Sequence, residues 1–211
     1  FDTLREAHLP VIGRAIERLA DEGQLFVVGS SGIEYALAAH WQESGSSRRS
    51  ARTADSPKPV KQLIAVSGSC SPVTDRQIEV AIQNGIPEVA LRSRHLMQVS
   101  HLGFVRTRIM LEVQDLLASS RGLILHTSRG PADTRMIKRN ATREKLASNL
   151  GPALALILEE PLVSTGVRRA VVCGGDTSMH VARALGIKAL EYLGPMAPGS
   201  PLCKVHAPGR I

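Results

Sequence analysis

From about residue 63 onward, short apolar runs alternate with longer segments in which apolar residues recur at helical spacing. The strand-like runs are residues 63–66, 88–91, 123–125, 170–173 and 189–192. Helices are predicted at 74–83, 106–119, 142–159 and 177–185, the first with Thr74 as its N-cap. Strands that alternate with helices usually form a parallel sheet with helices on both faces. The sequence therefore predicts an α/β fold with a mostly parallel, three-layer, Rossmann-like sheet.

The residues before this pattern form a separate group. An amphipathic helix is predicted at 3–20, a short strand at 25–28 and a second helix at 32–41. Residues 43–59 are rich in Ser, Gly, Arg and Pro, which is typical of a flexible linker. We therefore expect three parts: a helix–strand–helix segment at 1–42, the linker at 43–59, and an α/β domain at 60–211.

Composition excludes several classes of protein. The net charge is +7, but aromatic residues make up only 3%, whereas RNA-binding surfaces usually combine basic residues with stacking aromatics. A nucleic-acid partner is therefore disfavoured, although the basic linker keeps it open. No apolar stretch approaches the ~20 residues of a membrane helix, and the start at Phe1 is not typical of a secretory signal. We expect a cytoplasmic protein without a membrane partner.

The three cysteines agree with that compartment. Cys70, Cys173 and Cys203 are far apart and show no spacing typical of a zinc site. An odd number of unpaired cysteines suits a reducing environment. No protein metal site is predicted.

The most informative turn follows the run 170–173. It consists of Gly174, Gly175, Asp176, Thr177 and Ser178, between a predicted strand and a predicted helix. The glycines allow unusual backbone angles or a close ligand, and the hydroxyls and the carboxylate can cap the helix or contact phosphate and its metal-bound water. An ordinary strand-to-helix turn explains the same residues equally well when the turn is considered alone.

A second turn of the same kind follows the run 63–66. Ser67, Ser69 and Ser71 offer hydroxyls, Gly68 removes side-chain bulk, and Pro72 suits the first turn of the next helix. In open α/β sheets, ligands bind at the carboxyl ends of the strands, where helix N-termini attract anions. Two such turns at one edge of a parallel sheet predict a phosphate-binding site.

Other polar residues are weaker candidates. Arg129 follows the run 123–125 and could bind a phosphate with two hydrogen bonds, although an exposed turn arginine is the simpler interpretation. Similarly, His180 and Cys70 are more simply a helix residue and a small turn residue than catalytic groups. The turn at 29–32 is a third small-residue turn that could be purely structural. No catalytic residue is assigned from these patterns.

With these segments assembled, the chain resembles the four-carbon acid sugar kinase family. The segments that carry the resemblance are VVGSSGIEYALA (27–38), VSGSCSPVTDRQI (66–78), LHTSRGPAD (125–133), GVRRAVVCGGDTSMHVARALGI (166–187) and GPMAPGSPLCKV (194–205). They span nearly the whole chain in the family's order. The family's usual pattern in the last turn is GGET or GGDT, which Asp176 matches.

The resemblance implies a two-domain kinase for threonate, erythronate or an oxo-tetronate, in which the C-terminal domain binds ATP with Mg²⁺. Residues 1–42 would end the sugar-acid-binding domain, and 60–211 would be the nucleotide-binding domain, truncated at its C-terminal end. Ser67, Gly68, Ser69, Ser71 and the residues 174–178 would line the phosphates of ATP or ADP.

Two family motifs are not found in this chain: the Asp-Asp-x-Thr-Gly motif near the catalytic residues and the final Gly-rich strand end. The resemblance therefore implies that this chain alone would not phosphorylate the acid sugar. A non-catalytic, regulatory α/β module that binds a nucleotide or another ligand is the alternative. A homodimer also stays open.

Overall fold

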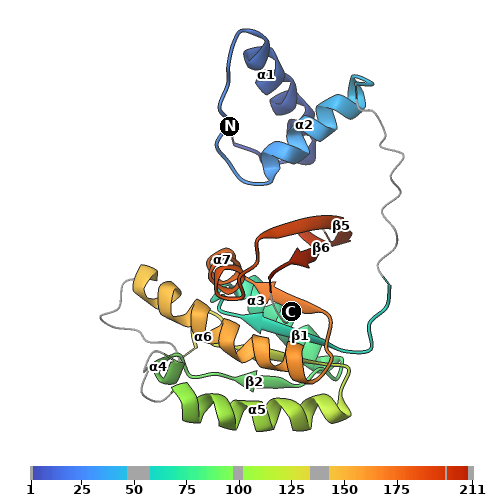
Figure 1. The fold of residues 1–211 in the computed structure, drawn as a ribbon. Helices are drawn as coiled ribbons and strands as arrows, with labels where there is room; N and C mark the ends of the chain where they lie inside the picture. Colours follow the sequence, from blue (N-terminus) through green and yellow to red (C-terminus); the bar gives the residue numbers. More distant parts are fainter. Residues whose placement is uncertain (1, 47–57, 97–101, 134–142, 198, 209–211) are drawn as a thin grey trace. The chain divides into compact units, whose positions relative to one another are not determined.

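The computed structural model describes residues 2–46, 58–96, 102–133, 143–197 and 199–208 (Figure 1). They form two compact units. We call Phe1–Ser56 with Leu193–Leu202 the helical unit, and Pro57–Tyr192 with Cys203–Ile211 the sheet unit. Most of the predicted linker, residues 47–57, lies outside the described part of the chain.

Two packed helices dominate the helical unit. After a short 3-10 helix, η1 (Glu6–His8), the chain forms α1 (Leu9–Asp21) and α2 (Gly32–Glu43). Both helices were predicted. They approach closely at Gly13, where a Cβ atom would lie only 2.1 Å from the carbonyl oxygen of Ala36. Glu17 links them further, because its carboxylate lies 2.7 Å from His40 Nε2 and accepts a 2.9 Å hydrogen bond from Trp41.

The predicted strand at residues 25–28 is wrong. These residues have no regular secondary structure, and Phe26 and Val28 are 83% and 96% exposed. A strand exists only through hydrogen bonds to a neighbouring strand, and none of the described strands pairs with this segment. The apolar, β-branched composition of the segment is therefore not sufficient to make it a strand here.

A parallel sheet forms the centre of the sheet unit. Its strands are β1 (Leu63–Ser67), β2 (Glu88–Ala90), β3 (Gly122–His126) and β4 (Ala170–Cys173), in the order β2-β3-β1-β4. All of their pairings are parallel. These four strands were predicted within a residue or two, and the predicted fold class is confirmed.

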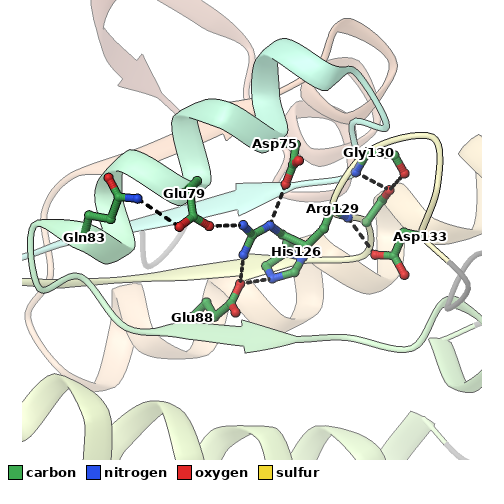
Figure 2. A network of polar contacts seen from close by, with 9 residues as sticks. Asp75, Glu79, Gln83, Glu88, His126, Arg129, Gly130 and Asp133 are labelled. Atoms are coloured by element: carbon green, nitrogen blue, oxygen red, sulfur yellow. Dashed lines mark hydrogen bonds and ion pairs between the residues drawn. The ribbon is translucent and has the colours of Figure 1, made fainter.

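Helices cover both faces of this sheet. They are α3 (Pro72–Gln83), α4 (Ser93–Leu96), α5 (Leu102–Ser119), α6 (Arg143–Ser164) and α7 (Gly175–Ala184). Leu123 and Leu125 belong to the main hydrophobic core, which β1 shares with α5 and α6. Ile124 points to the opposite face because side chains alternate along a strand. It is also buried, and Figure 2 shows α3 on that side of the strands, opposite α5.

The C-terminal part of the described chain contains more strand than predicted. β5 (Ala189–Ala197) extends beyond the predicted end at residue 192, and β6 (Ser200–His206) pairs with it in a two-stranded sheet. The prolines of this stretch argue against a strand in a sheet interior, but an edge position tolerates them. Gly199, with φ of +71°, lies between the two strands. The Pro- and Gly-rich composition of this stretch therefore did not indicate the short β-hairpin that it forms.

Candidate functional site: two strand-end turns in contact

The two turns predicted to bind phosphate begin at neighbouring positions of the sheet. Ser67, the last residue of β1, is in register with Cys173, the last residue of β4. On its other side, Ser67 is in register with His126 at the end of β3. The chain therefore leaves three adjacent strands at the same edge, and the turns at 67–71 and 174–178 lie next to each other.

Hydrogen bonds within the first turn hold it in place. Ser71 is the N-cap of α3, and its hydroxyl accepts a 3.2 Å hydrogen bond from the Val73 amide. Ser69 Oγ accepts from the Ser71 amide and lies 3.0 Å from the hydroxyl of Thr74. The predicted N-cap, Thr74, is thus wrong: it lies inside the helix, because Pro72 already occupies the first helical position, where the absent N–H costs nothing.

In the second turn, the N-cap of the helix is a glycine and not one of the side chains of residues 176–178 that the sequence offered for this role. Gly174 is the N-cap of α7 with φ of +103°, a conformation that favours glycine. Ser178 does not cap the helix: its hydroxyl donates to the Gly174 carbonyl at 2.8 Å. Gly174, Gly175 and Asp176 are exposed, whereas Thr177 is buried.

Direct packing joins the two turns. A Cβ atom on Gly68 would lie 2.4 Å from Thr177 Oγ1, and a Cβ on Gly174 would lie 3.4 Å from Ser69 Cβ. Glycine at position 68 is therefore needed for the approach of the turns to each other, and not only for the approach of a ligand. Ser67 and Thr177, both predicted to line the site, are 1% and 9% exposed and lie beneath its surface.

This arrangement has a clear electrostatic consequence. The N-terminal ends of α3 and α7 lie at the same edge of the sheet, and each carries partial positive charge from its unpaired backbone N–H groups. A site with two helix N-termini and little side-chain bulk is suited to a polyphosphate. Among the described residues, no cluster of His, Cys, Asp and Glu side chains could hold a metal ion by itself.

Arg129 lies in a network of carboxylates beside this site (Figure 2). Its Nε donates to Asp75 at 2.6 Å, its Nη2 to Glu79 at 2.6 Å and its Nη1 to Glu88 at 2.9 Å. The buried His126 pairs with the same Glu88 at 2.7 Å. The sequence left two interpretations of Arg129, a phosphate ligand or an exposed turn arginine. In the structure, its guanidinium instead donates hydrogen bonds to three carboxylates.

Sequence reasoning missed this network. A signal for part of it was present, since Asp75 and Glu79 are four residues apart and so lie on one face of a helix. The partner of that acidic face was not predictable from local patterns.

Two weaker candidates from the sequence lie elsewhere. The turn at residues 29–32 lies in the helical unit, and His180 packs against Gly151 of α6.

The network makes the stability of the sheet unit sensitive to acid. Burial alone would raise the pKa of Glu88, but hydrogen bonds from Arg129 and His126 outweigh it and lower the pKa below the ordinary 4.5. A carboxylate with a lowered folded-state pKa stabilises the fold above its unfolded pKa, and this stabilisation is lost as the pH falls through the folded value. We expect Glu88→Gln to remove part of the loss of stability between about pH 5 and about pH 3.

Urea denaturation of both proteins across that range measures the effect. Glu112→Gln, a change at an exposed position of α5, is the matched control and should keep the wild-type slope. An equally steep loss of stability in Glu88→Gln would contradict the assignment.

The cysteines show no sign of catalytic activation. All three are free thiols, and burial raises the pKa of Cys173, which keeps it protonated. Cys70 is an exposed thiol in the first turn. Within the described residues, no helix has both the length and the apolarity required to cross a bilayer.

Comparison with known proteins agrees with the site. Residues 64–210 match the family described as the nucleotide-binding C-terminal domain. The chain belongs to this family. The matched range includes both turns and the Arg129 network, and leaves out α1 and α2.

Relatives of this nucleotide-binding C-terminal domain include sugar-acid kinases. The chain is 35% identical to a 3-oxo-isoapionate kinase of Paraburkholderia graminis, over 97% of this chain and 44% of that protein. It is 33% identical to a 3-oxo-tetronate kinase of Methylobacterium radiotolerans, over 96% of this chain and 46% of that protein. The chain thus spans about half the length of the curated relatives it matches.

Solved structures share the fold. A protein from Salmonella typhimurium LT2 superposes with a TM-score of 0.65 at 22% identity, over 97% of this chain and 45% of that one. A domain of unknown function from Bordetella bronchiseptica, crystallised with citrate as a domain-swapped dimer, has a TM-score of 0.54 at 20% identity, over 99% of this chain and 46% of that one.

Proposed function

We propose that this chain carries the ATP site of a cytoplasmic kinase that phosphorylates a four-carbon acid sugar. The observation that carries the proposal is the direct contact between the turns at 67–71 and 174–178, which brings two helix N-termini to one edge of the sheet. Membership of a nucleotide-binding family supports the same ligand. Phosphoryl transfer relies mainly on positioning and on charge stabilisation of the phosphates, and paired helix N-termini supply both.

The residues of the two turns divide into two roles in this proposal. The exposed Gly174, Gly175 and Asp176 face the phosphates, and Asp176 would contribute its carboxylate toward the Mg²⁺ that accompanies ATP. Ser69 and Ser71 contribute hydroxyls, whereas Ser178 shapes the second turn, because its amide and its hydroxyl both donate to the Gly174 carbonyl. The buried Ser67 and Thr177, together with Gly68, hold the two turns against each other rather than contacting the nucleotide.

The acid sugar belongs to another part of the enzyme in this proposal. Residues 1–42 are the end of a substrate domain. The names of the kinase relatives support a 3-oxo-tetronate or a similar acid as the substrate. ATP-dependent phosphorylation of such acids by the protein that contains this chain tests the activity, and nucleotide binding without turnover would favour a regulatory role. A homodimer stays a prediction for sedimentation analysis.

Gly175→Ala offers a test of the nucleotide site that is independent of folding. A Cβ atom on Gly175 meets nothing within 4 Å, and its φ is not in the left-handed region, so alanine fits without strain. We expect unchanged or slightly higher stability, because alanine is favoured over glycine in helices by up to about 1 kcal/mol. The affinity for Mg-ADP, measured by isothermal titration calorimetry, should fall about tenfold, because a methyl group stands where the phosphates approach.

Gly103→Ala is the matched control. Gly103 also lies in the first turn of a helix, α5, and its Cβ would also meet nothing within 4 Å. This variant should bind Mg-ADP like the wild type. Absence of saturable Mg-ADP and Mg-ATP binding by the protein that contains this chain would overturn the proposal, and equal affinities of the wild type and Gly175→Ala would overturn the placement of the phosphates.

A further inference from the structure

The guanidinium of Arg129 joins three separate pieces of the sheet unit. Asp75 lies in the first turn of α3, Glu79 in its second turn and Glu88 at the start of β2. Each carboxylate binds a different nitrogen of the guanidinium, at 2.6, 2.6 and 2.9 Å. Arginine is suited to this task because its planar group presents donors in fixed directions. Arg129 lies in the turn that follows β3, which we call the β3 turn. Its side chain thus holds both the beginning of α3 and the start of the neighbouring strand β2.

The backbone around Arg129 is held equally firmly. Its amide donates to Asp133 at 2.7 Å, and Ser128 Oγ donates to the Gly130 carbonyl at 3.0 Å. Gly130, with φ of +96°, lies so close to α3 that a Cβ on it would be 3.5 Å from Asp75 Cβ. The β3 turn therefore packs on the first turn of α3, and Arg129 secures that contact.

Backbone hydrogen bonds connect this contact to the turn at 67–71, the first of the two turns proposed to bind phosphate. The Thr127 amide donates to the Ser67 carbonyl at 3.0 Å, so the β3 turn is bonded to the residue from which the first phosphate turn starts. At the other end of that turn, the Asp75 amide donates to the carbonyl of Ser71, the N-cap of α3, at 3.1 Å. The turn at 67–71 is therefore anchored at both ends to residues that contact the Arg129 network.

Arg129 itself is poorly suited to bind the nucleotide. All three of its guanidinium nitrogens donate to carboxylates, and its side chain is only 23% exposed. The hydrogen bond that Arg129 donates to Asp75, assisted by those to Glu79 and Glu88, raises the pKa of Arg129 in spite of its partial burial. Three carboxylates around one guanidinium leave an excess of negative charge, which repels a phosphate.

We propose that Arg129 is a positioning residue of the nucleotide site, and that its bonds to Asp75, Glu79 and Glu88 hold the N-terminal end of α3 beside the turn at 174–178. This inference rests on the proposed nucleotide site and deepens it. It assigns to the carboxylates the role of orienting a helix whose N-terminus receives the phosphates. Arg129 does not touch the nucleotide.

The test compares Arg129 with a matched arginine elsewhere. Arg106 of α5 donates to Glu160 of α6 at 2.8 Å, which is also an arginine–carboxylate bond between two elements. Arg129→Met should weaken Mg-ADP binding about tenfold at a temperature where circular dichroism shows the protein folded, because small displacements of binding groups cost large factors. Arg106→Met should lose stability to a similar degree but keep the wild-type affinity. Arg129→Lys, which keeps the charge among the carboxylates, should recover part of the affinity.

A second pair of variants separates positioning from direct binding. Glu79→Ala removes one anchor of α3 and one negative charge near the site, and Glu160→Ala is its control at the Arg106 pair. If Arg129 positions α3, Glu79→Ala weakens Mg-ADP binding, by about threefold for one of three bonds. If Arg129 is instead a phosphate ligand held back by carboxylates, the same variant strengthens binding.

Each result has one meaning. Weaker binding in Arg129→Met and Glu79→Ala, with both controls unchanged, supports the inference. Tighter binding in Glu79→Ala, or equal losses in Arg129→Met and Arg106→Met, overturns it while leaving the nucleotide site intact. Failure of the wild-type protein that contains this chain to bind Mg-ADP overturns the proposed function itself. Should Arg129→Met not fold, the Glu79→Ala measurement decides alone, because that side chain is partly exposed and its loss leaves α3 with a good helix former.

Discussion

Gly151→Ala should lower the free energy of unfolding of the sheet unit by about 1–3 kcal/mol, the usual cost of overpacking. A Cβ atom on Gly151 would lie 2.0 Å from the Cβ of His180 and 3.3 Å from its Cα. Atoms so close to the backbone cannot move aside by a change of rotamer, so α6 and α7 must separate. Because α7 begins at Gly175, this separation also displaces the turn at 174–178.

Urea denaturation followed by far-UV circular dichroism measures this loss. Gly103→Ala, for which nothing stands in the way of a Cβ atom, should stabilise rather than destabilise. A Gly151→Ala protein as stable as the wild type would show that the close crossing of α6 and α7 is not maintained in solution.

Gly68→Ala should reduce the affinity for Mg-ADP by about 100-fold, the loss expected when binding groups shift by about 1 Å. The new methyl group would stand 2.4 Å from Thr177 Oγ1 and so force the two turns apart. Titration calorimetry measures the affinity, and denaturation should show an accompanying loss of about 1–2 kcal/mol.

A double mutant tests the cause. Thr177→Ala removes the hydroxyl that would meet the new methyl group, so the stability of Gly68→Ala/Thr177→Ala should exceed the value expected from adding the two single effects. Simple additivity would mean that the turns do not contact each other as described. The affinity for Mg-ADP need not recover fully, because Thr177 also shapes the second turn.

Local patterns were enough to predict most of the sheet unit. The strands β1, β3 and β4 are short apolar runs, and small residues mark the turns that follow two of them. The parallel direction of the strands and the shared edge of the turns followed from the general rule that strands alternating with helices run parallel. The strand order β2-β3-β1-β4 was not predicted. The same reasoning failed at residues 25–28 and at β6, because pairing partners, and not composition, decide whether a segment is a strand.

The candidate site shows the same division between local and distant information. The residues of both turns were predicted from their positions after strands. Their roles were not, because burial of Ser67 and Thr177 depends on the contact between two turns that are more than 100 residues apart in the chain. Arg129 meets its three carboxylates across separations of 54, 50 and 41 residues, which no local pattern records.

The sequence by itself determined the α/β class and the positions of the strand-to-helix turns, because these depend on periodicity and on small residues near one another in the chain. Only the tertiary structure decided that glycine at 68 makes room for Thr177, and that Arg129 binds three carboxylates. The physical reason is that both depend on parallel register: Ser67 is paired with Cys173 on one side and with His126 on the other. That register brings distant side chains into contact.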